Sequence, residues 1–252
     1  MDPQKESILR RAIDFVEYLS LYERELYLKK DLAAQIARPR AAAVQPGQKT
    51  VGGLNPYPEY APYSSLAQME AAIKGCLRCG LGAGRAKFVF GVGSAEAKVV
   101  FIGEGPGAEE DKRGEPFVGR AGMLLNEMLE QIEWWREDVY ICNMIKCRPP
   151  NNRDPLPEET AMCEPYLHEQ LRLLQPQIIV ALGRIAAHAL LSTQSTLGSL
   201  RGRLHKFHGI PLWVTYHPAA LLRNQNLMPD AHQDLLTLKR MVTSGSLISE
   251  GE

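Results

Sequence analysis

The chain has 252 residues, of which 45% are hydrophobic, and its 29 basic and 29 acidic residues cancel to a formal net charge of zero. This length allows one good-sized core with a small extension, and the charge balance excludes a protein that a global field draws to nucleic acid or anionic membranes. No charged-then-apolar signal opens the sequence and no apolar run approaches the roughly 18 to 20 residues of a membrane span, so we expect a soluble, cytoplasmic and nucleoid-associated protein with no membrane partner.

The first 65 residues differ from the rest. Residues 1–37 are expected to form a helical extension, because apolar residues recur there in alternating steps of four and three: Ile8, Ala12, Phe15, Leu19, Tyr22 and Leu26. Such a helix could pack on its own domain or bind a repair or replication protein. Residues 38–65 are rich in proline and glycine, which predicts a linker. The main domain is then expected over residues 66–252.

Beyond the linker, apolar segments alternate with helical patterns. Strands are predicted over residues 99–103, 139–145, 178–182 and 212–216, and helices over residues 121–132, 157–174 and 184–191. This alternation indicates an α/β fold with a parallel sheet covered by helices on both faces. Ligands of such folds bind at the carboxyl ends of the strands.

Four of the five cysteines form two pairs, Cys76 with Cys79 and Cys147 with Cys163. An odd number of cysteines without a secretion signal argues against a disulfide framework. Two pairs of thiolates suit either Zn²⁺ or an iron–sulfur cluster, and buried structural cysteines are the simpler alternative. Cys142 lies within an apolar strand, where we expect it to be part of the core.

A glycine-rich turn follows the first predicted strand and formally matches the dinucleotide fingerprint through Gly103, Gly105 and Ala108. Pro106 removes a backbone donor, and the acidic residues 109–111 would repel a pyrophosphate. A nucleotide-dependent enzyme is therefore a distant alternative. A carboxylate at Glu104 in a rigid turn would better hold a water molecule or a developing cation.

Three segments, "GEGPGAEEDKRGEPFVGRAGMLL", "CNMIKCRPPNNRDPLPEE" and "TYHPAALLRN", together with the four paired cysteines, closely resemble the family 4 uracil-DNA glycosylases. The resemblance covers about residues 66 to 240. It implies a three-layer α/β/α sandwich on a four-stranded parallel sheet and a [4Fe-4S] cluster on the four cysteines. It also implies a monofunctional enzyme that flips uracil out of DNA and hydrolyses its N-glycosidic bond, leaving an abasic site for base excision repair.

The resemblance also implies roles for individual residues. Phe117 would stack on uracil, Asn143 would read its edge, and His217 would donate a hydrogen bond to O2 as negative charge develops on the base. Glu104 would orient the attacking water or stabilise the cationic sugar. Gly105 belongs to the substrate-binding turn and departs mildly from the commoner alanine.

A local basic and apolar surface would hold the DNA, since the chain carries no net charge. Its predicted members are Arg120, Arg201, Arg203, Leu221, Leu222 and Arg223. The two leucines are candidate wedges into the duplex, with a place in the core as the alternative for either, and the arginines are candidate phosphate contacts. We expect no acid near Arg201, Arg203 and Lys206.

The competing hypothesis is a covalent or non-catalytic uracil-DNA binding protein. In some relatives a histidine in the loop around His205 bonds covalently to the sugar. Those relatives carry a basic insertion before this histidine, which "GSLRGRLHKF" lacks. We therefore expect a turnover enzyme that binds uracil-containing DNA as a monomer.

Overall fold

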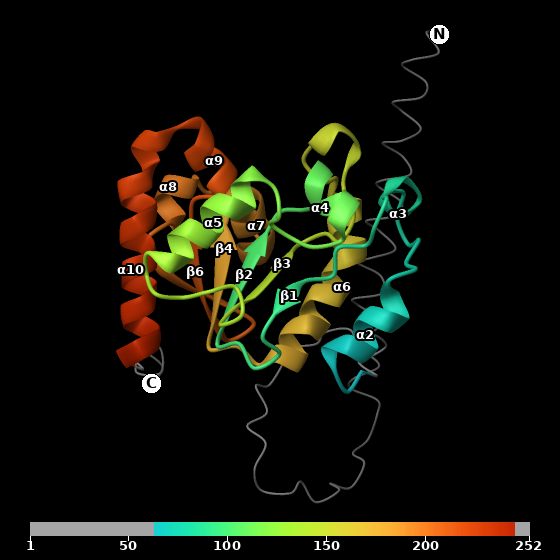
Figure 1. Cartoon of the computed structure of the whole chain (residues 1–252), viewed down its shortest axis with the longest axis horizontal. Coiled ribbons are helices and arrows are strands. Elements are labelled where there is room, and N and C mark those ends of the chain that lie inside the picture. The colour runs from blue at the N-terminus through green and yellow to red at the C-terminus, as the bar shows by residue number, and fades with distance from the viewer. Residues whose placement is uncertain (1–62, 245–252) are drawn as a thin grey trace, which may run out of the picture. The chain divides into compact units, whose positions relative to one another are not determined.

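The computed structural model describes residues 63–244 of the chain (Figure 1). The helical extension predicted over residues 1–37, and all but the last residues of the linker predicted over 38–65, lie outside the described residues. Within residues 63–244, no helix combines the length and the apolar character that crossing a membrane requires.

A six-stranded sheet of order β1-β3-β2-β4-β6-β5 runs through the domain. Its strands are β1 (Val92–Gly93), β2 (Val99–Gly103), β3 (Tyr140–Asn143), β4 (Ile178–Leu182), β5 (Leu204–Phe207) and β6 (Ile210–Thr215). The four central strands β3, β2, β4 and β6 are parallel, whereas β1 and β5 are antiparallel edge strands.

The expectation of a four-stranded parallel sheet therefore describes only the centre of the sheet and needs correction. The edge strands lack the apolar pattern of the centre, since β1 has two residues and β5 reads "LHKF" with half of its residues exposed. A tight turn at His208 and Gly209, both with positive φ (47° and 85°), joins β5 to β6. Such a hairpin turn favours residues that tolerate left-handed conformations.

Helices cover both faces of the sheet (Figure 1). One face packs against α5 (Arg120–Glu130), α9 (Pro218–Arg223) and α10 (Met228–Ser244), and the other against α6 (Pro157–Leu174), α7 (Gly183–Leu191) and α8 (Leu197–Leu200). Residues alternate between these two cores along β2: Val99 and Phe101 face one side, and Val100 and Ile102 the other. All five residues of β2 are buried, as in a sheet covered on both faces.

Short elements fill the region around the paired cysteines and the loops above the sheet. They are α2 (Leu66–Ile73), α3 (Leu81–Gly84), α4 (Ala108–Arg113) and the 3₁₀ turns η2 (Pro150–Asn152) and η3 (Gln225–Leu227). A third apolar cluster joins Met69 and Ile73 of α2 to Cys147, Cys163 and Tyr166. The chain segments that carry the two cysteine pairs are thus packed together.

Candidate active site

A cavity of about 510 Å³ lies beyond the carboxyl ends of the parallel strands. Its lining includes the residue that follows β2, the last residue of β3, the last residue of β4, and a residue two positions beyond β6: Glu104, Asn143, Leu182 and His217. Phe117 and Gly105 also line it. The structure therefore brings together all five residues predicted for catalysis and base binding, from segments that are far apart in the sequence.

Asn143 presents an unpaired polar atom to this cavity. Its side chain is only 2% exposed, and its Oδ1 atom has no hydrogen-bond partner within residues 63–244. Gly103 lies so close that a Cβ atom there would be 2.5 Å from this oxygen. A buried acceptor without a donor costs about 1–3 kcal/mol, so a ligand that supplies a hydrogen-bond donor would be stabilised here.

Phe117 has a backbone conformation that is unfavourable for a bulky residue. Its φ of 52° lies in the left-handed region, which costs of order 1–3 kcal/mol. Arg136 stabilises this turn by donating from Nη1 to the Phe117 carbonyl at 3.0 Å and from Nη2 to the Pro116 carbonyl at 2.6 Å. Glu110 accepts from the N–H groups of Val118 and Gly119, both at 2.9 Å.

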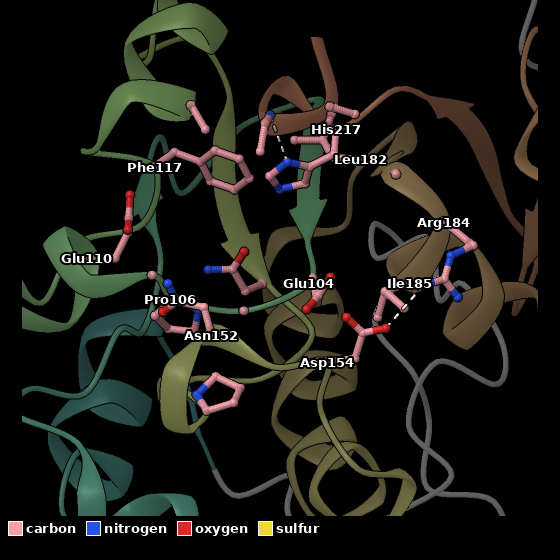
Figure 2. A pocket seen from close by; sticks show the side chains of 18 of the residues that line it. Glu104, Pro106, Glu110, Phe117, Asn152, Asp154, Leu182, Arg184, Ile185 and His217 are labelled. Atoms are coloured by element: carbon pink, nitrogen blue, oxygen red, sulfur yellow. Dashed lines mark hydrogen bonds and ion pairs between the residues drawn. The ribbon is translucent and has the colours of Figure 1, made fainter. Parts of the chain in front are cut away.

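The consequence of this turn is the position of the Phe117 ring. The ring lies beside the imidazole of His217 in the cavity wall, with centroids 5.5 Å apart and planes inclined by 32° (Figure 2). A Cβ atom at Gly122 would lie 1.9 Å from the Phe117 carbonyl oxygen, so only glycine fits beneath it. An aromatic face is thus exposed to the cavity by contacts from α4, α5 and the Arg136 loop.

His217 is neutral, and its hydrogen bonding fixes the position of its proton. It caps α9, where its Nδ1 atom accepts the N–H of Ala219 at 3.1 Å. Burial, with a smaller effect of the Arg223 charge, lowers its pKa to about 4. Because Nδ1 is an acceptor, the single ring proton is on Nε2, and the imidazole can donate one hydrogen bond.

Glu104 is a carboxylate with a raised pKa. Burial is the main cause and the charge of Asp154 adds to it, whereas Arg184 opposes both; the resulting pKa is about 7. Figure 2 shows Glu104 and Asp154 on the same side of the cavity, with Asp154 bound to Arg184 Nη2 at 3.1 Å. Near neutral pH, Glu104 can therefore both accept and release a proton.

The three acids after the glycine-rich turn have separate tasks. Glu109 forms a surface ion pair with Lys112 at 2.9 Å, and Glu110 holds the Phe117 turn. Asp111 is buried and accepts the backbone N–H of Ala86 at 2.9 Å. In the sequence these residues look like one charged group, and no local motif indicates the role of Glu110 or that of Arg136.

The four paired cysteines are free thiols that line a second, small cavity with Arg78 and Tyr166. Tyr166 donates to Cys76 Sγ and Arg85 Nη1 donates to Cys147 Sγ, both at 3.4 Å. Burial raises the pKa of Cys163 to about 12.

The arrangement of these thiols bears on which centre they could hold. Sulfur ligands around one tetrahedral zinc ion lie about 3.8 Å apart. Among the described residues, no three histidine, cysteine or acidic side chains are gathered closely enough to hold a single ion. The two cysteine pairs nevertheless line one cavity, and four thiolates are a ligand set that suits a polynuclear iron–sulfur centre as well as a single ion. Cys142 is separate from them and buried in the core, as predicted.

The structure contradicts part of the predicted DNA surface. Leu221 is fully buried in the core against α5 and α10, so the prediction that it is a wedge is wrong, whereas Leu222 is 38% exposed. Arg201 forms ion pairs with Asp230 and Asp234, both at 3.0 Å, so the expectation that no acid lies near it is wrong. The pattern of basic residues could not show these partners, because they come from α10.

The remaining predicted contacts differ in their distance from the cavity. Arg223 is exposed and lines it, and Arg120 is exposed at the first position of α5, three residues after Phe117. Arg203 is exposed but does not line the cavity. His205 also lies away from its lining, in edge strand β5, with Nε2 at 2.8 Å from the Leu200 carbonyl.

Comparison with known proteins identifies the relatives of this chain. Residues 90–237 match the uracil DNA glycosylase superfamily. The type-4 uracil-DNA glycosylase of Archaeoglobus fulgidus is 43% identical over 178 residues, which is 68% of this chain and 89% of that protein. The type-4 enzyme of Thermotoga maritima is 47% identical over 156 residues, or 61% of this chain and 81% of that protein. A type-5 uracil-DNA glycosylase of Pyrobaculum aerophilum is 32% identical over 146 residues, which is 51% of this chain and 64% of that protein.

Proposed function

The chain belongs to the uracil DNA glycosylase superfamily and to its type-4 branch, and on that premise we propose that it removes uracil from DNA. It takes the base out of the helix, hydrolyses the bond between uracil and deoxyribose, and leaves an abasic site for base excision repair. It is a hydrolase that uses water, with no covalent intermediate on the protein.

The observation that carries this proposal is the unpaired Oδ1 atom of Asn143 beside the ring of Phe117. Uracil offers an N3–H donor to this oxygen and an O4 acceptor to the amide nitrogen, while its face stacks on the aromatic ring. Cytosine carries an amino group and an unprotonated N3 at the same edge, so it would leave both polar groups of Asn143 unpaired. Unpaired buried polar groups are a strong basis for rejecting the wrong base.

The two ends of the cavity suit the charges that develop in the reaction. As the glycosidic bond breaks, its electron pair moves into the uracil ring, and the Nε2–H group of neutral His217 stabilises the negative charge at O2. The sugar becomes cationic, and a water molecule adds to it and passes a proton to Glu104. Leaving uracil then takes a proton from solvent.

We propose that DNA binds across the rim of this cavity. Arg223 and Arg120 would contact phosphates near the flipped nucleotide, and Leu222 would fill the space that the base leaves. Arg203 would contact phosphates further along the strand, and Arg201 is left out because its charge is paired.

A [4Fe-4S] cluster would be held by the four thiols that line the second cavity, since four cysteine thiolates are the usual ligands of such a cluster: Cys76, Cys79, Cys147 and Cys163. The cluster would supply a cross-link and not a redox step. It would tie the segment around α2 and α3 to the loop between β3 and α6, which contributes Asp154 to the cavity wall.

The direct test is incubation of the purified protein with single- and double-stranded oligonucleotides that contain one uracil. We expect many molecules of free uracil per molecule of protein, and no release from matched strands with cytosine or thymine. Asn143→Ala should lower kcat/KM by about 5- to 150-fold, the value of two neutral hydrogen bonds. A single turnover with a stable protein–DNA adduct would establish the covalent alternative, and absence of uracil release would refute the proposal.

A further inference from the structure

A fully buried lysine lies between the base-binding cavity and the cysteine site. Lys146 follows β3, three residues after Asn143 and one before Cys147, and its side chain is 0% exposed. Its Nζ atom donates a hydrogen bond to the carbonyl oxygen of Asn143 at 2.7 Å. Within residues 63–244 this is the one hydrogen bond seen for the ammonium group. Lysine is rarely buried without a charged partner, so this position requires an explanation.

The backbone of the same residue is tied on both sides. The N–H of Lys146 hydrogen-bonds the sulfur of Cys163, and its carbonyl accepts the N–H of Val89 at 2.9 Å. The preceding residues continue the pairing with β2, since Met144 donates to the Gly103 carbonyl at 2.9 Å. The segment from Asn143 to Cys147 is therefore a short connection between the two sites, and backbone hydrogen bonds hold it at Met144, Ile145 and Lys146.

The charge of Lys146 suits the cysteine site more than the base-binding cavity. Burying an ammonium costs several kcal/mol unless an anion compensates it, and one carbonyl dipole does not. Lys146 directly precedes Cys147, which lines the cavity of the four paired cysteines, whereas Lys146 does not itself line the base-binding cavity. Once these four cysteines bind iron as thiolates, the cluster carries a net negative charge. Arg85 and Arg78 approach the same site from its more exposed side.

We propose that Lys146 is a positioning residue that couples the cysteine site to base recognition. Its ammonium balances the charge of the cysteine-bound cluster, and its hydrogen bond to the Asn143 carbonyl holds the end of β3 so that the Asn143 amide meets the uracil edge. The part of this inference that concerns uracil rests on the proposed function, whereas the part that concerns iron does not.

The test replaces Lys146 by methionine, which has similar length and no charge, and uses Lys239→Met as the matched control. Lys239 lies on α10 and pairs with Glu133. Iron and sulfide per chain are measured, and iron loss to a chelator is followed by the visible absorbance of the protein. Loss of an outer partner of a metal site typically costs 10- to 100-fold, so we expect iron release to be faster by about that factor in Lys146→Met and unchanged in the control.

Steady-state kinetics on uracil-DNA test the second half of the inference. Normalised to iron content, Lys146→Met should raise KM about tenfold with a smaller change in kcat, because the misplaced Asn143 weakens base binding. Wild-type iron release combined with wild-type KM would overturn the proposal. Absence of uracil release by the parent protein would refute the proposed function instead and would leave the iron result valid.

Lys146→Arg separates the effect of charge from the effect of side-chain shape. If the methionine variant does not fold, the arginine variant alone tests the inference. The guanidinium keeps the positive charge but cannot reproduce the same short hydrogen bond to Asn143. We expect iron release within about twofold of the parent and an increased KM. Rapid loss of iron from this variant would show that shape rather than charge matters at this position, and would overturn the inference.

Discussion

The sharpest prediction concerns the pH dependence of the reaction through Glu104. On the proposed mechanism Glu104 must be ionised to take a proton from water, and its pKa is about 7 because of burial and the nearby Asp154. About half of the enzyme is then active at pH 7 and about a tenth at pH 6, while activity is nearly full above pH 8. The pKa of His217 is lowered to about 4, so the histidine stays neutral across this range. It therefore does not contribute to the acid limb of the pH–activity profile, the fall in activity below about pH 7.

Asp154→Asn tests the cause of this limb. Removing the negative charge of Asp154 lowers the pKa of Glu104, so the acid limb moves to lower pH. Asp154 is 63% exposed, and interactions of exposed charges are worth about 0.2–1 kcal/mol. The rate at pH 6 should therefore exceed that of the parent by a factor of about 1.4 to 4, with little change above pH 8. Arg184→Met should move the limb the other way, because Arg184 opposes the shift.

The assay is kcat/KM on a short single-stranded uracil substrate from pH 5 to 9 at constant ionic strength, since kcat/KM reports the groups of the free enzyme. Glu137→Gln, which neutralises an exposed carboxylate outside the cavity, is the control and should reproduce the parent profile. A profile that is flat between pH 6 and 8, or an acid limb that Asp154→Asn leaves in place, would refute the reasoning.

Three further substitutions test the cavity. His217→Ala should lower kcat by about a hundred- to a thousandfold while the acid limb near pH 7 remains, as single-turnover rates across the same pH range would show. Arg136→Met removes the donors that hold Phe117 in its left-handed conformation, so we expect kcat/KM to fall about tenfold. Arg136→Lys should restore part of this loss. An unchanged kcat/KM in both variants would contradict the role of this turn. Gly103→Ala would place a Cβ atom 2.5 Å from Asn143 Oδ1 and 2.6 Å from the Phe117 ring. The rate of uracil release should therefore fall at least about a hundredfold. Gly198→Ala is the control, because its Cβ atom meets nothing within 4 Å, and it should leave the rate unchanged.

The central sheet and the cavity residues could be predicted because their signals are local. Buried parallel strands are continuous apolar runs, and polar residues at their ends converge at one edge of the sheet whatever the details of packing. The predicted helix over residues 157–174 agrees with the bounds of α6, Pro157–Leu174. The edge strand β5 was missed because an exposed edge carries no apolar alternation.

Errors and omissions arose where a role depends on a distant partner. Leu221 and Leu222 are chemically identical neighbours, and only the packing of α9 on α5 buries one and exposes the other. In the sequence Arg201 has no acidic neighbour, whereas in the fold two aspartates of α10 form ion pairs with it. Arg136 lies in a loop without any motif, and its importance comes from carbonyl groups about twenty positions earlier in the chain.

The structure also bears on which role Glu104 has, a question that its sequence position leaves open. A carboxylate that only stabilises a cationic sugar works best with a low pKa, because it must be ionised in every enzyme molecule. A base that removes a proton from water works best with a pKa near the operating pH. The surroundings of Glu104 give it a pKa near neutral pH, as a base requires. Burial and Asp154 both raise this pKa. Arg184 opposes the rise, and its guanidinium is paired with Asp154 at 3.1 Å. With the Nε2–H group of neutral His217 stabilising the departing base, we propose Glu104 as the group that activates water.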